Sequence, residues 1–378
     1  MQAKFQLQAQ KELKEQVIKN DLCTGCGACV HLCPYFEHYR DKTVILHECD
    51  GADGRCYAYC PRTPVNLSVL REKLFSPADW TVEIGPVKGF FMTRARDQKI
   101  RDAAQHGGTV SALMTLALSE GIIDAAVLAG QKENLLSESI TTSDSNTIAS
   151  RGKSKFVVSP TVALFNDAAK GPSKRIGLVA TPCQALALAK MRGFPKEGDE
   201  EKAAKLKLVI GLFCGWALSW EALKPLLDQK FGATRILKVD IPPSKHHCME
   251  VTTEKGIVEI PLSEVEKTVR KNCSYCFDMT CEFSDISVGS ARSPEGWAVD
   301  KGWNQVIVRS DTGQALLELA RVRGILEFKP VPDGNLEKLK SASMNKKRNC
   351  VRHLSEKSGQ AADLIYLDRD DPAVIGCS

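Results

Sequence analysis

Seven cysteines fall between residues 23 and 60 of this 378-residue chain, and their spacing constrains the fold more than any other feature. Four form a C-x2-C-x2-C-x3-C-P run, and three follow at wider intervals. They are Cys23, Cys26, Cys29, Cys33, Cys49, Cys56 and Cys60. A [4Fe–4S] cube needs four inward-facing thiolates, and gaps of two residues let one loop supply three of them. The spacing, with Pro34 and Pro61 after the two runs, predicts iron–sulfur clusters for electron transfer.

The pairing rule of two-cluster ferredoxins divides these cysteines into two ligand sets, because the fourth cysteine of each run ligates the cluster of the other run. On that rule the first cluster is held by Cys23, Cys26, Cys29 and Cys60. The second cluster takes Cys33, Cys49 and Cys56, and is one cysteine short.

The gap between Cys49 and Cys56 leaves several interpretations of the second cluster open. An oxygen atom of Asp50 or Asp53 could supply the missing ligand, as could a cysteine from elsewhere in the fold. A three-iron cluster would need no further ligand. A Gly/Asp turn beside an incomplete site is the structural alternative.

Composition is that of a globular protein of two or three domains, with 43% hydrophobic and 26% charged residues. The net charge of +5 is spread along the chain and does not indicate nucleic-acid binding. An odd total of 15 cysteines fits clusters with spare thiols better than disulfides. Residues 1–20 lack the apolar region of an export signal, and no apolar stretch is long enough to span a membrane. We therefore expect a cytoplasmic protein, or one peripheral to a membrane complex, with no membrane insertion of its own.

The chain divides into four predicted parts. These are an N-terminal helix (1–17), a small α+β ferredoxin-like two-cluster module (18–75), an α/β domain (88–345) and a surface-wrapping C-terminal tail (346–378). In the α/β domain, apolar runs alternate with amphipathic segments, which predicts a mixed, partly parallel sheet. The predicted strands are Asp124–Leu128, Arg175–Ala180, Leu206–Phe213, Asp285–Gly289 and Asn304–Arg309. The predicted helices are Thr109–Glu120, Pro182–Met191, Trp220–Phe231 and Gly313–Val322.

A second set of cysteines lies where such a sheet binds ligands. Cys183 and Cys214 each follow an apolar strand and precede a helix, and ligands of open α/β sheets collect at the carboxyl ends of strands. Cys273 and Cys276 form a later C-x2-C pair, so that these four could make a third four-thiolate site, with Cys281 a rival for one corner. Buried free thiols or a structural zinc are the alternatives. Three further cysteines are interpreted as spare: Cys248, Cys350 and Cys377.

Over about residues 88–345 the chain resembles the beta subunits of coenzyme F420-reducing hydrogenase and F420-dependent formate dehydrogenase. The similarity rests on eight segments: His106–Leu113, Glu120–Asp124, Ser154–Phe156, Ala180–Cys183, Gly211–Cys214, Cys273–Asp278, Asp285–Gly289 and Val306–Arg309. The two N-terminal cysteine runs resemble those of the subunit that delivers F420H2 electrons to membrane complexes. Similar subunits serve heterodisulfide-reductase-type complexes.

The resemblance implies an FAD-binding α/β domain that exchanges a hydride with coenzyme F420. It also implies a [4Fe–4S] cluster in that domain, with the ligands Cys183, Cys214, Cys273 and Cys276. The implied partners are other subunits of a hydrogenase, formate dehydrogenase, heterodisulfide-reductase-type or membrane F420H2 dehydrogenase complex. Two to three clusters would carry the electrons to such a partner.

A flavin suits this position because it accepts two electrons as a hydride and releases them singly to clusters. Adjacent glycines before a predicted helix could bring backbone N–H groups to the FAD pyrophosphate. The residues expected to bind the cofactor are Gly107, Gly108, Thr109, Ser111, Lys155, Thr181, Asp285 and Gly289. No general acid or base is expected, because hydride transfer requires geometry and desolvation. Two rival functions are an NAD(P)H-linked flavin subunit, although the chain lacks a G-x-G-x-x-G fingerprint, and an electron relay without a substrate of its own.

Overall fold

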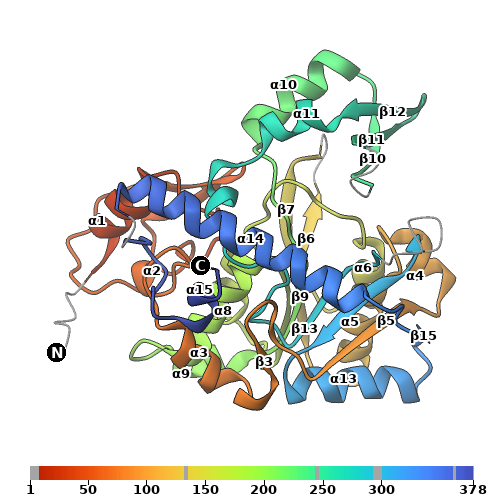
Figure 1. Cartoon of the computed structure of the whole chain (residues 1–378), viewed down its shortest axis with the longest axis horizontal. Coiled ribbons are helices and arrows are strands. Elements are labelled where there is room, and N and C mark those ends of the chain that lie inside the picture. The colour runs from red at the N-terminus through yellow and green to blue at the C-terminus, as the bar shows by residue number, and fades with distance from the viewer. Residues whose placement is uncertain (1–7, 132–134, 243–246, 293–299, 361–362, 378) are drawn as a thin grey trace.

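An eight-stranded mixed sheet forms the centre of the computed structural model, which describes residues 8–131, 135–242, 247–292, 300–360 and 363–377 (Figure 1). The strand order is β15-β5-β14-β13-β9-β8-β6-β7. The four strands β13, β9, β8 and β6 are parallel neighbours, and antiparallel strands flank them on both sides. The strands are β5 (Gly89–Ala95), β6 (Ala125–Gln131), β7 (Ser137–Thr142), β8 (Ile176–Ala180), β9 (Leu206–Leu212), β13 (Ile286–Ser290), β14 (Asn304–Val308) and β15 (Leu326–Lys329). The predicted mixed, partly parallel sheet is confirmed.

Helices cover both faces of this sheet, because alternate residues of the parallel strands enter two different cores. Leu208 and Ile210 pack with α5 and α13, whereas Val209 packs with α7 and α8. Burial on both faces explains why these strands read as continuous apolar runs. These helices are α5 (Thr109–Ser119), α7 (Thr161–Ala168), α8 (Pro182–Gly193) and α13 (Asp311–Val322). The five strands and four helices predicted from the sequence are all present.

A smaller lobe with its own core stands out from the main body (Figure 1). It consists of α10 (Trp220–Phe231), α11 (Leu262–Val265) and a three-stranded antiparallel sheet of β10 (Ile236–Asp240), β11 (Cys248–Thr253) and β12 (Gly256–Pro261). Only its helix α10 was predicted, because β12 exposes apolar residues such as Ile257 and Val258 and so lacks the apolar–polar alternation of a half-buried strand.

The N-terminal cysteine module packs directly on the α/β domain. Its elements are α1 (Gln10–Leu13) with a π-helical turn (Lys14–Ile18), β1 (Phe36–Tyr39), β2 (Lys42–Ile45), α2 (Arg55–Ala58) and α3 (Leu67–Leu74). Cys26, Tyr59 and Leu70 belong to the same core as residues of β8 and α8. A buried ion pair joins Arg270 to Asp41, at 2.6 Å. The module therefore shares a core with the sheet domain.

A long C-terminal helix, α14 (Asn335–Ser358), crosses the molecule from the sheet domain to the N-terminal module (Figure 1). It spans position 345, where the sequence analysis placed the start of a tail of low pattern. The Lys347 ammonium is buried and donates to Glu282. Beyond the helix, Asp371 forms a buried ion pair with Arg71 of α3. These interior ion pairs compensate charged residues of the segment, so that it can be partly buried. The polar sequence alone does not show which of its charges find such partners.

Candidate iron–sulfur centres and cofactor edge

All 15 cysteines are free thiols, and eleven of them gather into three groups. The first N-terminal group consists of Cys23, Cys26, Cys29 and Cys60. Burial raises the pKa of Cys29 well above its ordinary value. The Cys29 thiol also interacts electrostatically with the other three members, Cys23, Cys26 and Cys60. The structure thus brings together the four residues that the crossed pairing rule assigns to one cluster.

The second N-terminal group consists of Cys33, Cys49 and Cys56. Burial raises the pKa of Cys56 to about 12, and its thiol interacts with the other two. The Asp53 carboxylate, one suggested oxygen ligand, is engaged by Lys196 at 2.6 Å. Asp50, the other suggested oxygen ligand, is exposed at the surface. Among the described residues, the structure brings no fourth cysteine into this group.

The domain group consists of Cys183, Cys214, Cys273 and Cys276. Cys183 lies in the first turn of α8 after β8, and Cys214 follows the neighbouring strand β9, so both lie at the carboxyl edge of the sheet. The Cys214 thiol interacts electrostatically with the other three. The Ala217 amide donates to the Cys273 sulfur at 3.3 Å.

Burial makes these thiols poor anions unless a cation compensates them. It raises the pKa of Cys183, Cys214 and Cys273 above their ordinary values. A cluster reverses this preference, since its ferric and ferrous ions require thiolate ligands and neutralise them. The donor set of the domain group, four buried sulfurs from three separate segments, therefore fits a [4Fe–4S] cluster.

Cationic side chains that the sequence analysis did not identify surround these groups. Burial favours a neutral Cys276, but Lys346 and Arg62 outweigh it and hold the pKa of Cys276 below its ordinary value. The Lys346 ammonium donates to the Cys214 carbonyl at 2.8 Å. Lys190, which is buried, donates to the Cys60 carbonyl at 2.7 Å. No local sequence signal marks these residues, because each reaches its cysteine from a distant element.

The first N-terminal group interacts electrostatically with both of the other groups, through different cysteines. Cys26 interacts electrostatically with Cys183 of the domain group. The buried Thr24 hydroxyl forms hydrogen bonds that lower the pKa of both. Cys29 interacts with Cys56 of the second N-terminal group. The three groups thus form a continuous row from the sheet edge into the N-terminal module.

Cys281 is separated from most of the domain group by its own interactions. Its side chain is fully buried, and its thiol donates to the Ala180 carbonyl at 3.6 Å. It interacts with Cys183 but lies against Gly211, whose Cβ position would be 2.5 Å from the sulfur. The structure thus gives Cys281 a packing role beneath the sheet edge.

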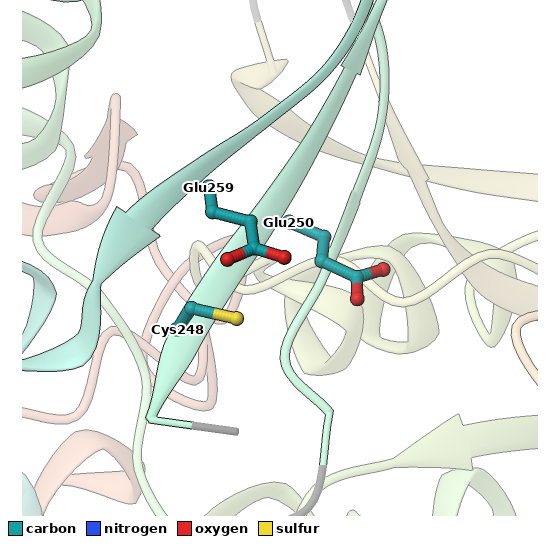
Figure 2. Close-up of side chains that lie close together, drawn as sticks. All are labelled: Cys248, Glu250 and Glu259. Carbon is teal, nitrogen blue, oxygen red and sulfur yellow. The ribbon is translucent and has the colours of Figure 1, made fainter.

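One additional group of possible metal ligands lies in the small lobe (Figure 2). The ligand atoms of Cys248, Glu250 and Glu259 all lie within 4.8 Å of one another. Glu250 and Glu259 are cross-strand neighbours on β11 and β12. Glu259 is exposed to solvent, and acidic groups of this kind are common on protein surfaces without a metal.

The predicted cofactor glycines begin α5 at the same edge of the sheet as Cys183 and Cys214. Gly108 has the left-handed backbone (φ 76°) that lets the chain turn into the helix. A Cβ on Gly107 would lie 2.6 Å from the Asn304 side-chain oxygen. Thr109 is fully buried, and its hydroxyl lies 2.8 Å from that of Thr93. These contacts fix the backbone of the first turn of α5 at the carboxyl edge of the sheet.

The remaining predicted cofactor residues have different environments. Lys155 lines a pocket that the segment 153–157 forms with residues of the small lobe, and burial lowers its pKa to about 8. Ser111 is buried in α5. Thr181 caps α8 through a reciprocal interaction with Gln184. Gly289 accommodates the Phe213 ring, which would lie 2.1 Å from a Cβ there.

Asp285 has a structural position that corrects the prediction of a cofactor contact. It precedes β13 and therefore lies at the amino end of that strand, at the edge opposite the carboxyl ends of the parallel strands. Its carboxylate accepts hydrogen bonds from the Val209 amide and the Ser310 hydroxyl, both at 2.7 Å. Asp285 thus joins β9 to the start of α13.

The motif and fold place the chain among iron–sulfur proteins, since a 4Fe-4S binding domain model matches residues 17–35. Models described as the N-terminal and C-terminal parts of the coenzyme F420 hydrogenase/dehydrogenase beta subunit match residues 90–166 and 173–334. The chain therefore belongs to the coenzyme F420 hydrogenase/dehydrogenase beta subunit family, as the resemblance predicted.

Individual relatives agree with this assignment. A coenzyme F420 hydrogenase subunit beta of Methanothermobacter thermautotrophicus is 32% identical over 75% of this chain and 99% of its own length. One of the subunits of the F(420)H(2) dehydrogenase of Methanosarcina mazei is 27% identical over 90% of this chain and 94% of its own length. The latter match extends the similarity into the N-terminal module.

A solved structure shares the fold. A chain of the F420-reducing [NiFe] hydrogenase complex from Methanosarcina barkeri superposes with a TM-score of 0.66 at 24% identity, over 75% of this chain and 94% of that chain. Among the helices that the structure describes, none is both long and apolar enough to cross a membrane.

Proposed function

We propose that this chain is an F420-dependent oxidoreductase subunit that exchanges a hydride between coenzyme F420 and bound FAD and passes single electrons to a partner subunit. One observation carries this proposal. The three cysteine groups form a continuous row, linked by the Cys26–Cys183 and Cys29–Cys56 interactions. The row begins at the sheet edge where α5 begins and ends in the N-terminal module.

The residues at the sheet edge support FAD as the cofactor. The tight turn at Gly107 and Gly108 brings the first turn of α5 to the carboxyl edge, where α/β folds bind nucleotide phosphates. Lys155 is half-buried and can pair with an anionic group, and the amide of the preceding Ser154 donates to Gln105, two residues before Gly107. When bound, FAD supplies the conversion between two-electron and one-electron transfer. The chain's own contribution is to hold the cofactor near Cys183 and Cys214 and to exclude water.

The cluster ligands follow the three groups. The first N-terminal group and the domain group would each hold a [4Fe–4S] cluster, and the second N-terminal group would hold a three-iron cluster or one completed by a non-cysteine ligand. The relatives are subunits of F420-linked hydrogenase and dehydrogenase complexes by name, which supports a partner subunit as the electron acceptor or donor. The second N-terminal group lies farthest along the row and is the proposed exit.

The experiment that tests this function is anaerobic reduction of the FAD-loaded protein with reduced F420, beside NADH and NADPH. Bleaching of the flavin absorbance by reduced F420 alone supports the proposal. Bleaching by a nicotinamide alone replaces F420 with NAD(P)H as the carrier. Flavin-loaded protein that no donor bleaches is an electron relay that receives its electrons from a partner, and the proposed hydride exchange is then wrong.

A further inference from the structure

Arg62 is a buried cation without a carboxylate partner. Its side chain is 4% exposed, and among the described residues it forms no ion pair with an Asp or Glu. One guanidinium nitrogen, Nη1, donates to the Tyr366 hydroxyl, and Nη2 donates to the Asn272 carbonyl at 3.3 Å. The third nitrogen, Nε, is buried with no hydrogen-bond partner. An uncompensated interior charge of this kind costs several kcal/mol, so Arg62 needs an anion.

The position of Arg62 identifies that anion. It follows Cys60 of the first N-terminal group by two residues and lines a cavity together with Cys183 and Cys276 of the domain group. The Arg62 amide donates to the Cys60 sulfur at 3.4 Å. Asp278 and Glu282 line the same cavity, but among the described residues neither forms an ion pair with Arg62, and Glu282 is paired with Lys347. The thiolates of the two groups are therefore the anions that remain to compensate the Arg62 charge.

Arg62 also holds the loop that carries two domain ligands. The Asn272 carbonyl that it contacts immediately precedes Cys273. Tyr366, which stacks against the guanidinium at 4.8 Å, donates to the Tyr275 carbonyl at 2.6 Å, immediately before Cys276. One residue of the N-terminal module thus reaches the ligand loop of the α/β domain both directly and through Tyr366.

Two other cations provide a contrast, because each faces one group. Lys190 interacts with Cys60 and Cys26, both in the first N-terminal group. Lys346 interacts with Cys214, Cys273 and Cys276, all in the domain group. Cluster reduction adds a negative charge, and a nearby fixed cation favours the reduced form.

We propose that Arg62 is a counter-ion shared by the clusters of the first N-terminal group and the domain group, and that it raises the reduction potential of both. This inference rests on the cluster assignment within the proposed function. Because Arg62 contacts the Cys60 sulfur through its amide and lines a cavity with Cys183 and Cys276, the added charge of either reduced cluster meets the same cation. Lys190 and Lys346 adjust the two potentials separately.

The test is an anaerobic redox titration with dithionite and mediators, in which electron paramagnetic resonance follows each cluster of the full chain. Arg62→Gln removes the charge but keeps an amide donor, and we expect each cluster's ratio of reduced to oxidised form to fall about tenfold at a fixed potential, a shift of about 59 mV for one electron. Arg62→Lys keeps the charge and should leave both potentials near wild type. Lys190→Met should lower the potential of the first N-terminal cluster alone, and Lys346→Met that of the domain cluster alone.

Several outcomes would overturn the proposal. These are unchanged potentials in Arg62→Gln, a shift of one cluster alone, or equal shifts in Arg62→Lys and Arg62→Gln, which would indicate altered packing. If Arg62→Gln does not fold, Arg62→Met removes the same charge, and its titration decides by the same criteria. Dithionite reduction needs no F420, so an error in the proposed hydride carrier leaves this test intact, whereas a wild-type protein without iron refutes both.

Discussion

The N-terminal module and the α/β domain gather cysteines in opposite ways. The first N-terminal group takes three of its four members from one seven-residue loop, Cys23–Cys29, whereas the domain group draws on positions 183, 214, 273 and 276. In the module, the loop itself determines which sulfurs meet. In the domain, parallel pairing of β8 with β9 places Cys183 and Cys214 at one edge. Local spacing and sheet topology are thus two independent routes to a buried four-thiolate site.

Removal of one cysteine from the first N-terminal group and, separately, one from the domain group should have the largest effects on iron content. The two variants should differ in how much of the fold is lost. Cys26→Ala should lose about four irons per chain and loosen the module, because Cys26 also belongs to the core shared with α8. Cys276→Ala should lose as many irons but keep the sheet domain folded, since the core of α5 and α13 contains no cysteine. Iron analysis and limited proteolysis measure both outcomes. Equal proteolytic sensitivity of the two variants would contradict this difference.

The buried ion pair between the two regions gives the next largest effect. Asp41 is fully buried and accepts from Arg270 and from the Trp220 amide, so Asp41→Ala leaves a buried cation and an amide unpaired. We expect a loss of about 3–5 kcal/mol in the free energy of unfolding, measured by denaturant titration. The exposed pair Asp21–Lys271 is the matched control, and Lys271→Ala should cost less than about 1 kcal/mol. Similar losses in the two variants would show that the buried pair adds no more stability than an exposed one.

A larger residue at Gly107 tests whether FAD binds at the turn before α5. In Gly107→Ala, the new methyl would lie 2.6 Å from the Asn304 side-chain oxygen and displace the first turn of α5. We expect FAD affinity to fall about tenfold, a loss of about 1.4 kcal/mol, measured by fluorescence titration. Gly171→Ala is the control, because its Cβ would meet only a carbonyl oxygen at 3.4 Å. Normal FAD binding by Gly107→Ala would move the flavin away from this turn.

The smallest expected effect concerns pH. Burial lowers the pKa of Lys155 to about 8, so the free protein holds this side chain charged below pH 8 and neutral above it. An anionic group bound beside it would raise the pKa, and by linkage the affinity for FAD should fall as pH rises from about 7 to about 9.5. In Lys155→Gln the affinity should be about fivefold weaker at neutral pH and lose most of this pH dependence. A slope that persists in the variant would assign it to another group.

Much of the fold was predictable because it depends on local patterns. The strand at Leu206–Leu212 and the helix at Pro182–Gly193 carry apolar runs or capping residues that specify their type without the rest of the chain. The strands of the small lobe and the C-terminal part of α14 were missed for opposite reasons. β12 is largely exposed although it carries apolar residues, whereas α14 is polar in composition although its Lys347 is buried against Glu282.

The same distinction applies to the candidate sites. The crossed pairing of the N-terminal cysteines was predicted from the rule for two-cluster ferredoxins, which needs only the order of the cysteines in the chain. Asp285 was misplaced because a strand pattern does not show which side chains are already satisfied by neighbouring strands. The interaction of Cys26 with Cys183, and the position of Arg62 beside Cys183 and Cys276, come from the folded arrangement alone. Those contacts depend on how two regions far apart in the chain pack together. Burial between them strengthens the electrostatic interactions of each charge, and no local sequence pattern encodes this burial.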